Sequence, residues 1–136
     1  MEERINDKIE ELETYLEQLL SIAPENLEEY EKDFKTKAAC ERLFEKIIEA
    51  VIDISFLFIR KKKYPFPEDD EAVFNVLAEK RIITTEFAKK LQDAKSMRNF
   101  IIHKYGEIDD SKVFYSIKEE IENDVNKFIK LIEKEK

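Results

Sequence analysis

The only histidine of this 136-residue chain, His103, stands in a short stretch with an arginine and a tyrosine. Arg98 comes five residues before it and Tyr105 two residues after it. In a helix these positions fall within about two turns and hold a permanent cation, a proton carrier for neutral pH and a phenol. A guanidinium fork matches phosphate oxygens, and an imidazole can accept or donate a proton. The stretch therefore suits phosphate chemistry.

The spacing of Arg98 and His103 sets a geometric condition on such a site. Positions five apart lie about 140° apart around an ideal helix, so the two side chains do not share a face. Arg98 shares a face with Tyr105, and His103 shares one with Asn99. A compact site therefore requires two copies of the motif. The alternative is an accidental motif, with Arg98 on the surface and His103 packed in the core.

The composition predicts the architecture that must hold these residues. Hydrophobic residues make up 43% of the chain and charged residues 41%, with one glycine, three prolines and no tryptophan. Long amphipathic helices have this composition, and the length suits one domain over residues 1–136. We expect an all-α, antiparallel up-and-down bundle of four to five helices.

Apolar spacing and capping residues place the helices along the chain. The longest expected helix, 36–63, is apolar on nearly all sides between residues 47 and 59, which predicts a second cover such as a subunit interface. The motif helix begins after Thr84 or Thr85 and ends before Gly106. The other expected helices cover residues 4–22, 25–33, about 69–80, and the segment that begins at 109 or 110.

Two charged features of the long helix are candidate parts of a site. Asp53 lies in its apolar part, where an unpaired carboxylate is costly, so it either meets water or pairs with a donor, for which we favour Arg98. The run Arg60, Lys61, Lys62 and Lys63 ends the helix. It reads either as cations at a helix C-terminus or as a contact to a nucleic-acid backbone beside the motif.

Charge and cysteine usage restrict the function. A formal net charge of −8 argues against general coating of nucleic acid, so any such contact must be local. The single Cys40 predicts a free thiol in a reducing compartment, and no signal peptide or spanning segment is expected, which favours a cytoplasmic protein without membrane contact. Without zinc spacing, a P-loop or a dinucleotide fingerprint, we expect no metal and no cofactor.

The string Arg98-Asn99 followed by His103-Lys104-Tyr105, late in a helical chain, resembles the signature of the HEPN ribonucleases. Within them it is closest to the HepT toxins, whose motif runs R-x4-H-x-Y. The segments 49–54 and 108–109 with the run that follows also resemble family helices.

This resemblance implies a homodimer whose two motifs meet across a two-fold interface. It also implies a metal-independent endoribonuclease toxin, with Arg98 and His103 catalytic and with Asn99 and Asp53 orienting them. Its partner would be a minimal nucleotidyltransferase antitoxin that silences it by AMPylation, and Tyr105 matches the modified tyrosine of the family. The alternative from another class is a catalytically silent helical module that binds and regulates a nucleotidyltransferase.

Overall fold

The computed structural model describes residues 2–103 and 109–135, and these residues form helices without a β-strand. The two longest α-helices within these ranges are α1 and α3. The elements, in chain order, are α1 (Glu2–Ile22), α2 (Leu27–Lys32), α3 (Phe34–Lys62), the 3-10 turn η1 (Asp70–Ala72), α4 (Val73–Glu79), α5 (Thr85–His103), α6 (Asp110–Tyr115), the π-helical turn η2 (Ser116–Glu120) and α7 (Ile121–Glu135).

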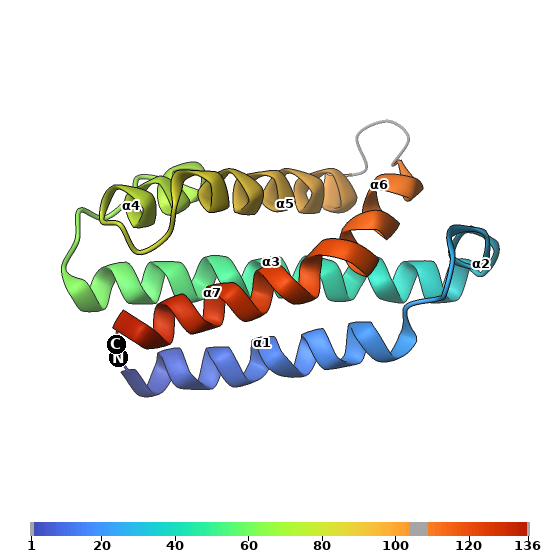
Figure 1. Ribbon diagram of the computed structural model, residues 1–136, viewed down its shortest axis with the longest axis horizontal. Helices are drawn as coiled ribbons and strands as arrows, with labels where there is room; N and C mark the ends of the chain where they lie inside the picture. The colour runs from blue at the N-terminus through green and yellow to red at the C-terminus, as the bar shows by residue number, and fades with distance from the viewer. Residues whose placement is uncertain (1, 104–108, 136) are drawn as a thin grey trace.

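Four long helical segments run up and down and pack side by side, which confirms the predicted bundle (Figure 1). They are α1, α3, α5 and the segment from α6 through η2 to α7. The short helix α2 lies at one end of the bundle, where α1 connects to α3, and α4 lies at the other end, before α5 (Figure 1). The antiparallel course therefore places the C-terminal end of α5 beside α6 and far from the C-terminal end of α3.

The core forms around α3, which packs against α1, α4, α5 and α7. Its apolar residues recur at three- and four-residue steps, and Phe44, Ile47, Val51, Ile54 and Phe58 are all buried. Each large apolar side chain that folding buries contributes about 1.5–3 kcal/mol. The central place of this helix, predicted from its length and its apolar run, is confirmed.

Side-chain caps fix where the site helices begin. Asp33 accepts hydrogen bonds from the backbone N–H groups of Lys35 and Thr36, so α3 begins a little earlier than predicted. Thr84 Oγ1 accepts from Phe87 N at 3.0 Å, as predicted for the start of α5. The predicted helix stop at Gly106 lies outside the described residues.

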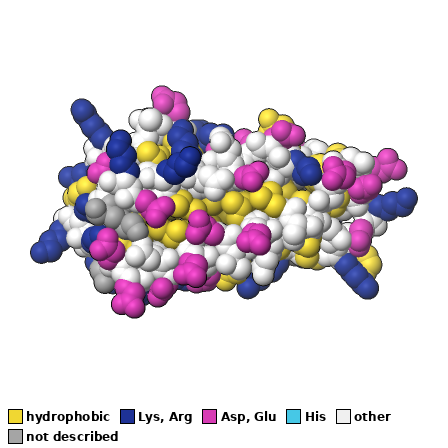
Figure 2. Space-filling model, turned by 60° about the horizontal axis from the view of Figure 1, so that its bottom comes forward, with side chains coloured by type: hydrophobic (Ala, Val, Ile, Leu, Met, Phe, Trp, Pro, Cys, Tyr) yellow, Lys and Arg dark blue, Asp and Glu magenta, His cyan; other side chains and the backbone are white. Residues whose placement is uncertain are grey.

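The face that carries α1 bears charges of both signs, because the groove between α1 and α3 contains Lys8, Arg42 and Lys46 beside Glu11, Glu49 and Asp53. Figure 2 shows this face with an apolar strip along its length and carboxylates beside the strip. Within the described part of the chain, no helix is long and apolar enough to cross a membrane.

Candidate active site

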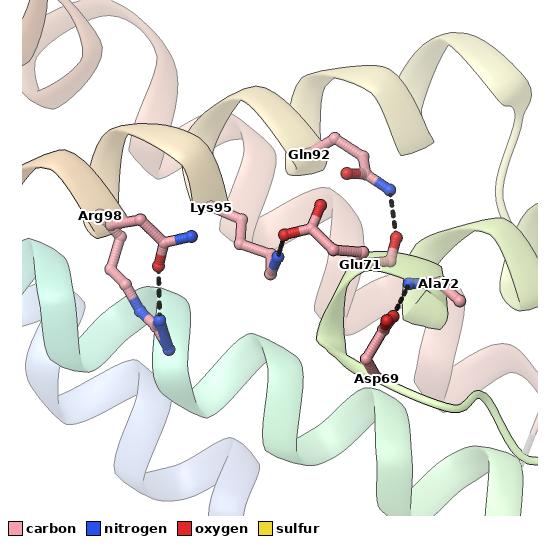
Figure 3. A network of polar contacts seen from close by, with 7 residues as sticks. Asp69, Glu71, Ala72, Gln92, Lys95 and Arg98 are labelled. Carbon is pink, nitrogen blue, oxygen red and sulfur yellow. Dashed lines mark hydrogen bonds and ion pairs between the residues drawn. The ribbon is translucent and has the colours of Figure 1, made fainter.

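Arg98 lies on the side of α5 that faces α3 (Figure 3). It is half-buried, and its Nη1 donates a hydrogen bond to Oδ1 of Asn99 at 2.8 Å. Its Nε is buried and has no hydrogen-bond partner among the described residues. An arginine placed only for stability would have its buried donors satisfied, because an unpaired buried donor costs about 1–3 kcal/mol. This arrangement leaves a guanidinium whose donors are incompletely used.

His103 is the last residue of α5 and is exposed. Because a single helix carries both residues of the motif, the angle of about 140° between Arg98 and His103 applies to the folded chain. Asn99, which comes one turn before His103, lies on the same side of α5. The imidazole and the guanidinium thus leave the helix in different directions within one chain.

An open groove lies beside this end of α5, between α5 and α6. It is lined on one side by four residues of α5 and on the other by the start of α6: Asp93, Ser96, Met97 and Phe100, and Asp109, Lys112 and Val113. The Phe100 ring is 52% exposed. An exposed aromatic ring near a cation is a combination that binds single-stranded nucleic acid. Sequence reasoning missed Lys112, because nothing in the chain links it to the motif before folding.

Asp53 is placed differently from our expectation. Its Oδ2 lies 3.6 Å from Nζ of Lys8, and its side chain is about half exposed. It belongs to a polar groove between α1 and α3 that also contains Glu49. The favoured pairing of Asp53 with Arg98 is therefore not formed within one chain. The reason is that α3 turns positions 49 and 53 towards α1, whereas α5 packs on another side of α3.

The basic run from Arg60 to Lys63 lies at the opposite end of α5 from His103. The 19 residues of α5 span about 28 Å, and the end of α3 lies near the start of α5. Lys61 Nζ is 3.3 Å from Glu2 Oε1, and Arg60 lies over the Phe66 ring, 5.4 Å from its centroid. The alternative of an RNA contact beside Arg98 and His103 is thus not formed within one chain. The run fits the other reading, cations at a helix C-terminus.

A buried polar cluster fixes the start of α6 near the motif. Lys37 Nζ on α3 forms an ion pair with Asp110 Oδ2 at 2.9 Å. The Tyr30 hydroxyl and Asp110 Oδ1 are buried without a hydrogen-bond partner among the described residues. Burial, followed by the charge of Glu41, raises the pKa of Tyr30 well above its ordinary value. The cluster holds α2, α3 and α6 together at the His103 end.

Two further expectations concern Tyr105 and metals. Tyr105 lies outside the described residues. Within residues 2–103 and 109–135, no group of three or more His, Cys, Asp and Glu side chains is placed to hold a metal ion.

The chain is similar to known proteins over most of its length. The model of the family described as ribonuclease HepT-like matches residues 5–132. The tRNA nuclease HepT of Aphanizomenon flos-aquae is 30% identical over 113 residues, which cover 83% of this chain and 77% of that protein. A putative RNase of Archaeoglobus fulgidus is 32% identical over 124 residues, which cover 89% of this chain and 92% of that one.

Solved structures agree with the fold. The tri-AMPylated HEPN toxin of Shewanella oneidensis, in complex with MNT antitoxin, superposes with a TM-score of 0.89. The alignment covers 96% of each chain at 22% sequence identity. At this identity the likeness supports the helical arrangement, and the catalytic groups must be argued from the side chains themselves.

Proposed function

Because the chain belongs to the ribonuclease HepT-like family, we propose that it is a metal-independent endoribonuclease toxin whose catalytic groups are Arg98 and His103. The observation that carries the proposal is the end of α5. There an exposed imidazole follows a guanidinium whose buried Nε has no partner among the described residues. Arginine and histidine together supply charge stabilisation and proton transfer, the two needs of phosphodiester cleavage.

The site is proposed to form between two copies of the chain. Arg98 and His103 leave α5 in directions about 140° apart, so one chain cannot direct both groups at one phosphate. A two-fold axis near this end of α5 brings a second motif to the first. Asn99 orients Arg98 through its hydrogen bond of 2.8 Å. Asp53 has Lys8 as its partner, so any part it plays belongs to the assembled dimer.

In the proposed reaction the 2′-oxygen of a ribose attacks the adjacent phosphorus. A bond forms between these atoms while the bond from phosphorus to the 5′-oxygen breaks. The imidazole of His103 takes the proton of the attacking hydroxyl or gives a proton to the leaving oxygen, and solvent accepts or supplies the other proton. The guanidinium of Arg98 stabilises the charge that builds on the phosphate oxygens.

The proposed partner is a minimal nucleotidyltransferase antitoxin. The Shewanella toxin of similar fold is described as tri-AMPylated and in complex with MNT antitoxin. Tyr105 of this chain stands two residues after His103 and is the proposed acceptor of AMP. AMP phosphates beside Arg98 compete for the cation that an RNA phosphate needs.

The test is cleavage of RNA by the purified protein with and without excess chelator. Activity should persist with chelator and be lost in Arg98→Ala and in His103→Ala, with circular dichroism unchanged. Lys89→Ala is the matched control, because this cation also lies on α5 but is 75% exposed and paired with Asp93. Cleavage abolished by the chelator contradicts the mechanism, and full activity of both variants contradicts the site.

A further inference from the structure

A buried cation lies one turn before Arg98 on the same helix. Lys95 is only 3% exposed, whereas lysine is almost never fully buried unless it is paired. Its Nζ forms an ion pair with Oε1 of Glu71 at 2.5 Å. The Glu71 side chain is itself 70% exposed. The carboxylate of Glu71 therefore stands between a buried ammonium group and solvent.

The backbone of Glu71 is held without the help of its carboxylate. Gln92 Nε2 on α5 donates to the Glu71 carbonyl oxygen at 2.8 Å (Figure 3). Asp69 Oδ1 accepts from Ala72 N at 3.2 Å and closes the turn of η1. The first contact keeps η1 against α5, and the second keeps the turn in its shape. The carboxylate of Glu71 can consequently leave Lys95 by rotation of its side chain alone.

Lys95 extends the row of groups that contains the motif. Lys95 and Arg98 are three residues apart, which places their Cβ atoms about 5–6 Å from each other. Figure 3 shows both side chains extending from α5 towards α3. Around the helix axis Lys95 stands about 60° from Arg98 and about 80° from His103, between their two directions. Lys95, Arg98 and His103 thus form a polar and cationic track along this part of α5.

The charge balance of this track favours an anion. Lys95 and Arg98 supply two cations, and Glu71 supplies one carboxylate that is largely exposed. In a chain with a formal net charge of −8, such a local positive excess requires an explanation. A buried ammonium needs an anionic partner in every state of the protein. A phosphodiester oxygen meets this need as a carboxylate does, through a charge-assisted hydrogen bond.

We propose that Lys95 binds a phosphate of the RNA next to the one that is cut, and that Glu71 occupies this anion site until RNA displaces it. The inference rests on the proposed RNA cleavage and adds a second substrate contact to it. Binding at Lys95 is an exchange of anions, in which the phosphate replaces the Glu71 carboxylate and the carboxylate moves into solvent. The exchange favours a polyanion that reaches Arg98 and Lys95 together over a single small anion.

The test measures binding rather than cleavage, with a single-stranded oligoribonucleotide whose 2′-hydroxyls are methylated so that it cannot be cut. Glu71→Gln removes the competing charge and keeps an acceptor, so affinity should rise severalfold. Lys95→Met keeps the length of the side chain but removes its charge, so affinity should fall about tenfold. The slope of log affinity against log salt should also become shallower by about 0.7 for Lys95→Met.

The two variants are expected to change RNA affinity in opposite directions, which distinguishes this role from a purely structural one. If the Lys95–Glu71 pair only holds η1 to α5, both variants lose stability and neither alters affinity or the salt slope, which overturns the proposal. The matched control is Lys89, an exposed cation on the same helix whose Nζ lies 3.1 Å from Asp93 Oδ1. Lys89→Met should leave affinity nearly unchanged.

Arg98→Ala separates this inference from the proposed function. If Arg98→Ala weakens binding while Lys95→Met does not, only the second contact is wrong. If the wild type does not bind the oligonucleotide, or Arg98→Ala binds as well as the wild type, the proposed function fails and this inference with it. Should Lys95→Met fail to fold by circular dichroism, Glu71→Gln decides: tighter binding supports the site and unchanged binding overturns it.

Discussion

Arg98 donates a hydrogen bond of 2.8 Å from Nη1 to Oδ1 of Asn99, the next residue along α5. Consecutive residues of a helix point about 100° apart. The contact therefore ties the guanidinium, which lies on the side that faces α3, to a residue on the side that carries His103. It restricts the rotation of the Arg98 side chain. We infer that Asn99 is a positioning residue for Arg98.

Loss of this contact should lower the rate of cleavage more than it weakens RNA binding. Asn99→Ala leaves Arg98 charged but free to turn, so kcat should fall about tenfold with a smaller change in KM. Asn99→Asp keeps an acceptor but adds a negative charge beside the phosphate, so it should lose at least as much. Single-turnover cleavage measures the effect. Asn123→Ala, an exposed change on α7, is the control, and a wild-type kcat in Asn99→Ala would refute the positioning role.

Complementation between two inactive variants tests whether the site forms across two chains. In a mixed dimer of Arg98→Ala and His103→Ala chains, one site would keep an intact Arg98 from one chain and an intact His103 from its partner. Random pairing makes half of the dimers mixed, so co-expressed variants should recover about a quarter of the wild-type activity. Each variant expressed alone should stay inactive. No recovery, together with a monomer in light scattering at micromolar concentration, would exclude the shared site.

Much of the fold follows from local patterns. The three- and four-residue spacing of apolar residues predicts α1, α3, α5 and the last helix, because each must bury one stripe against its neighbours. The family and the enzyme class indicated by the R-x4-H-x-Y string are also confirmed. Periodicity identifies the buried face of a helix but does not say which neighbour covers it. That limit explains the wrong partner expected for Asp53.

The position of the basic run relative to His103 could not be predicted for the same reason. The antiparallel course of α3 and α5 separates Lys63 from His103 by the length of a helix. A run of basic residues in a sequence does not show which end of a neighbouring helix it will lie beside. Lys95 did leave a signal, since it follows Leu91 by four residues and so stands on the inner side of α5. A cation at a position that favours an apolar residue indicates a buried charge with a specific partner. Its partner, Glu71, is 24 residues away and could not be identified before folding.

The buried thiol of Cys40 should make the protein less stable at alkaline pH. Burial, and then the charge of Glu41, raises the pKa of Cys40 from 9.0 to about 11. Between these values the unfolded chain releases the proton while the folded chain keeps it, so the stabilising difference is complete below about pH 9 and is lost as pH rises towards 11. The free energy of unfolding should fall by about 2–3 kcal/mol over this range.

Urea unfolding at about pH 8 and about pH 11 measures this loss. Cys40→Ala removes the titrating group, so the decline of its stability should be shallower than that of the wild type. Comparison of the two proteins cancels the lysines and tyrosines, which titrate in both. Parallel decline in wild type and variant would show that Cys40 contributes nothing to the alkaline sensitivity.

Modification of Tyr105 should silence the enzyme by competing for the cations of α5. Tyr105 stands seven residues after Arg98 in the sequence, and each AMP group adds a negatively charged phosphate. Such phosphates would occupy Arg98 and repel an incoming RNA backbone, so both binding and cleavage should be lost.

Tyr105→Phe should keep its cleavage activity and escape silencing by a cognate nucleotidyltransferase. Intact-mass spectrometry after incubation with that partner and ATP should show AMP-sized additions on the wild type and none on Tyr105→Phe. Tyr115→Phe is the control, because Tyr115 is 58% exposed on α6 but lies outside the motif. If the additions disappear in Tyr115→Phe and persist in Tyr105→Phe, the modified residue is Tyr115 and the proposed role of Tyr105 is wrong.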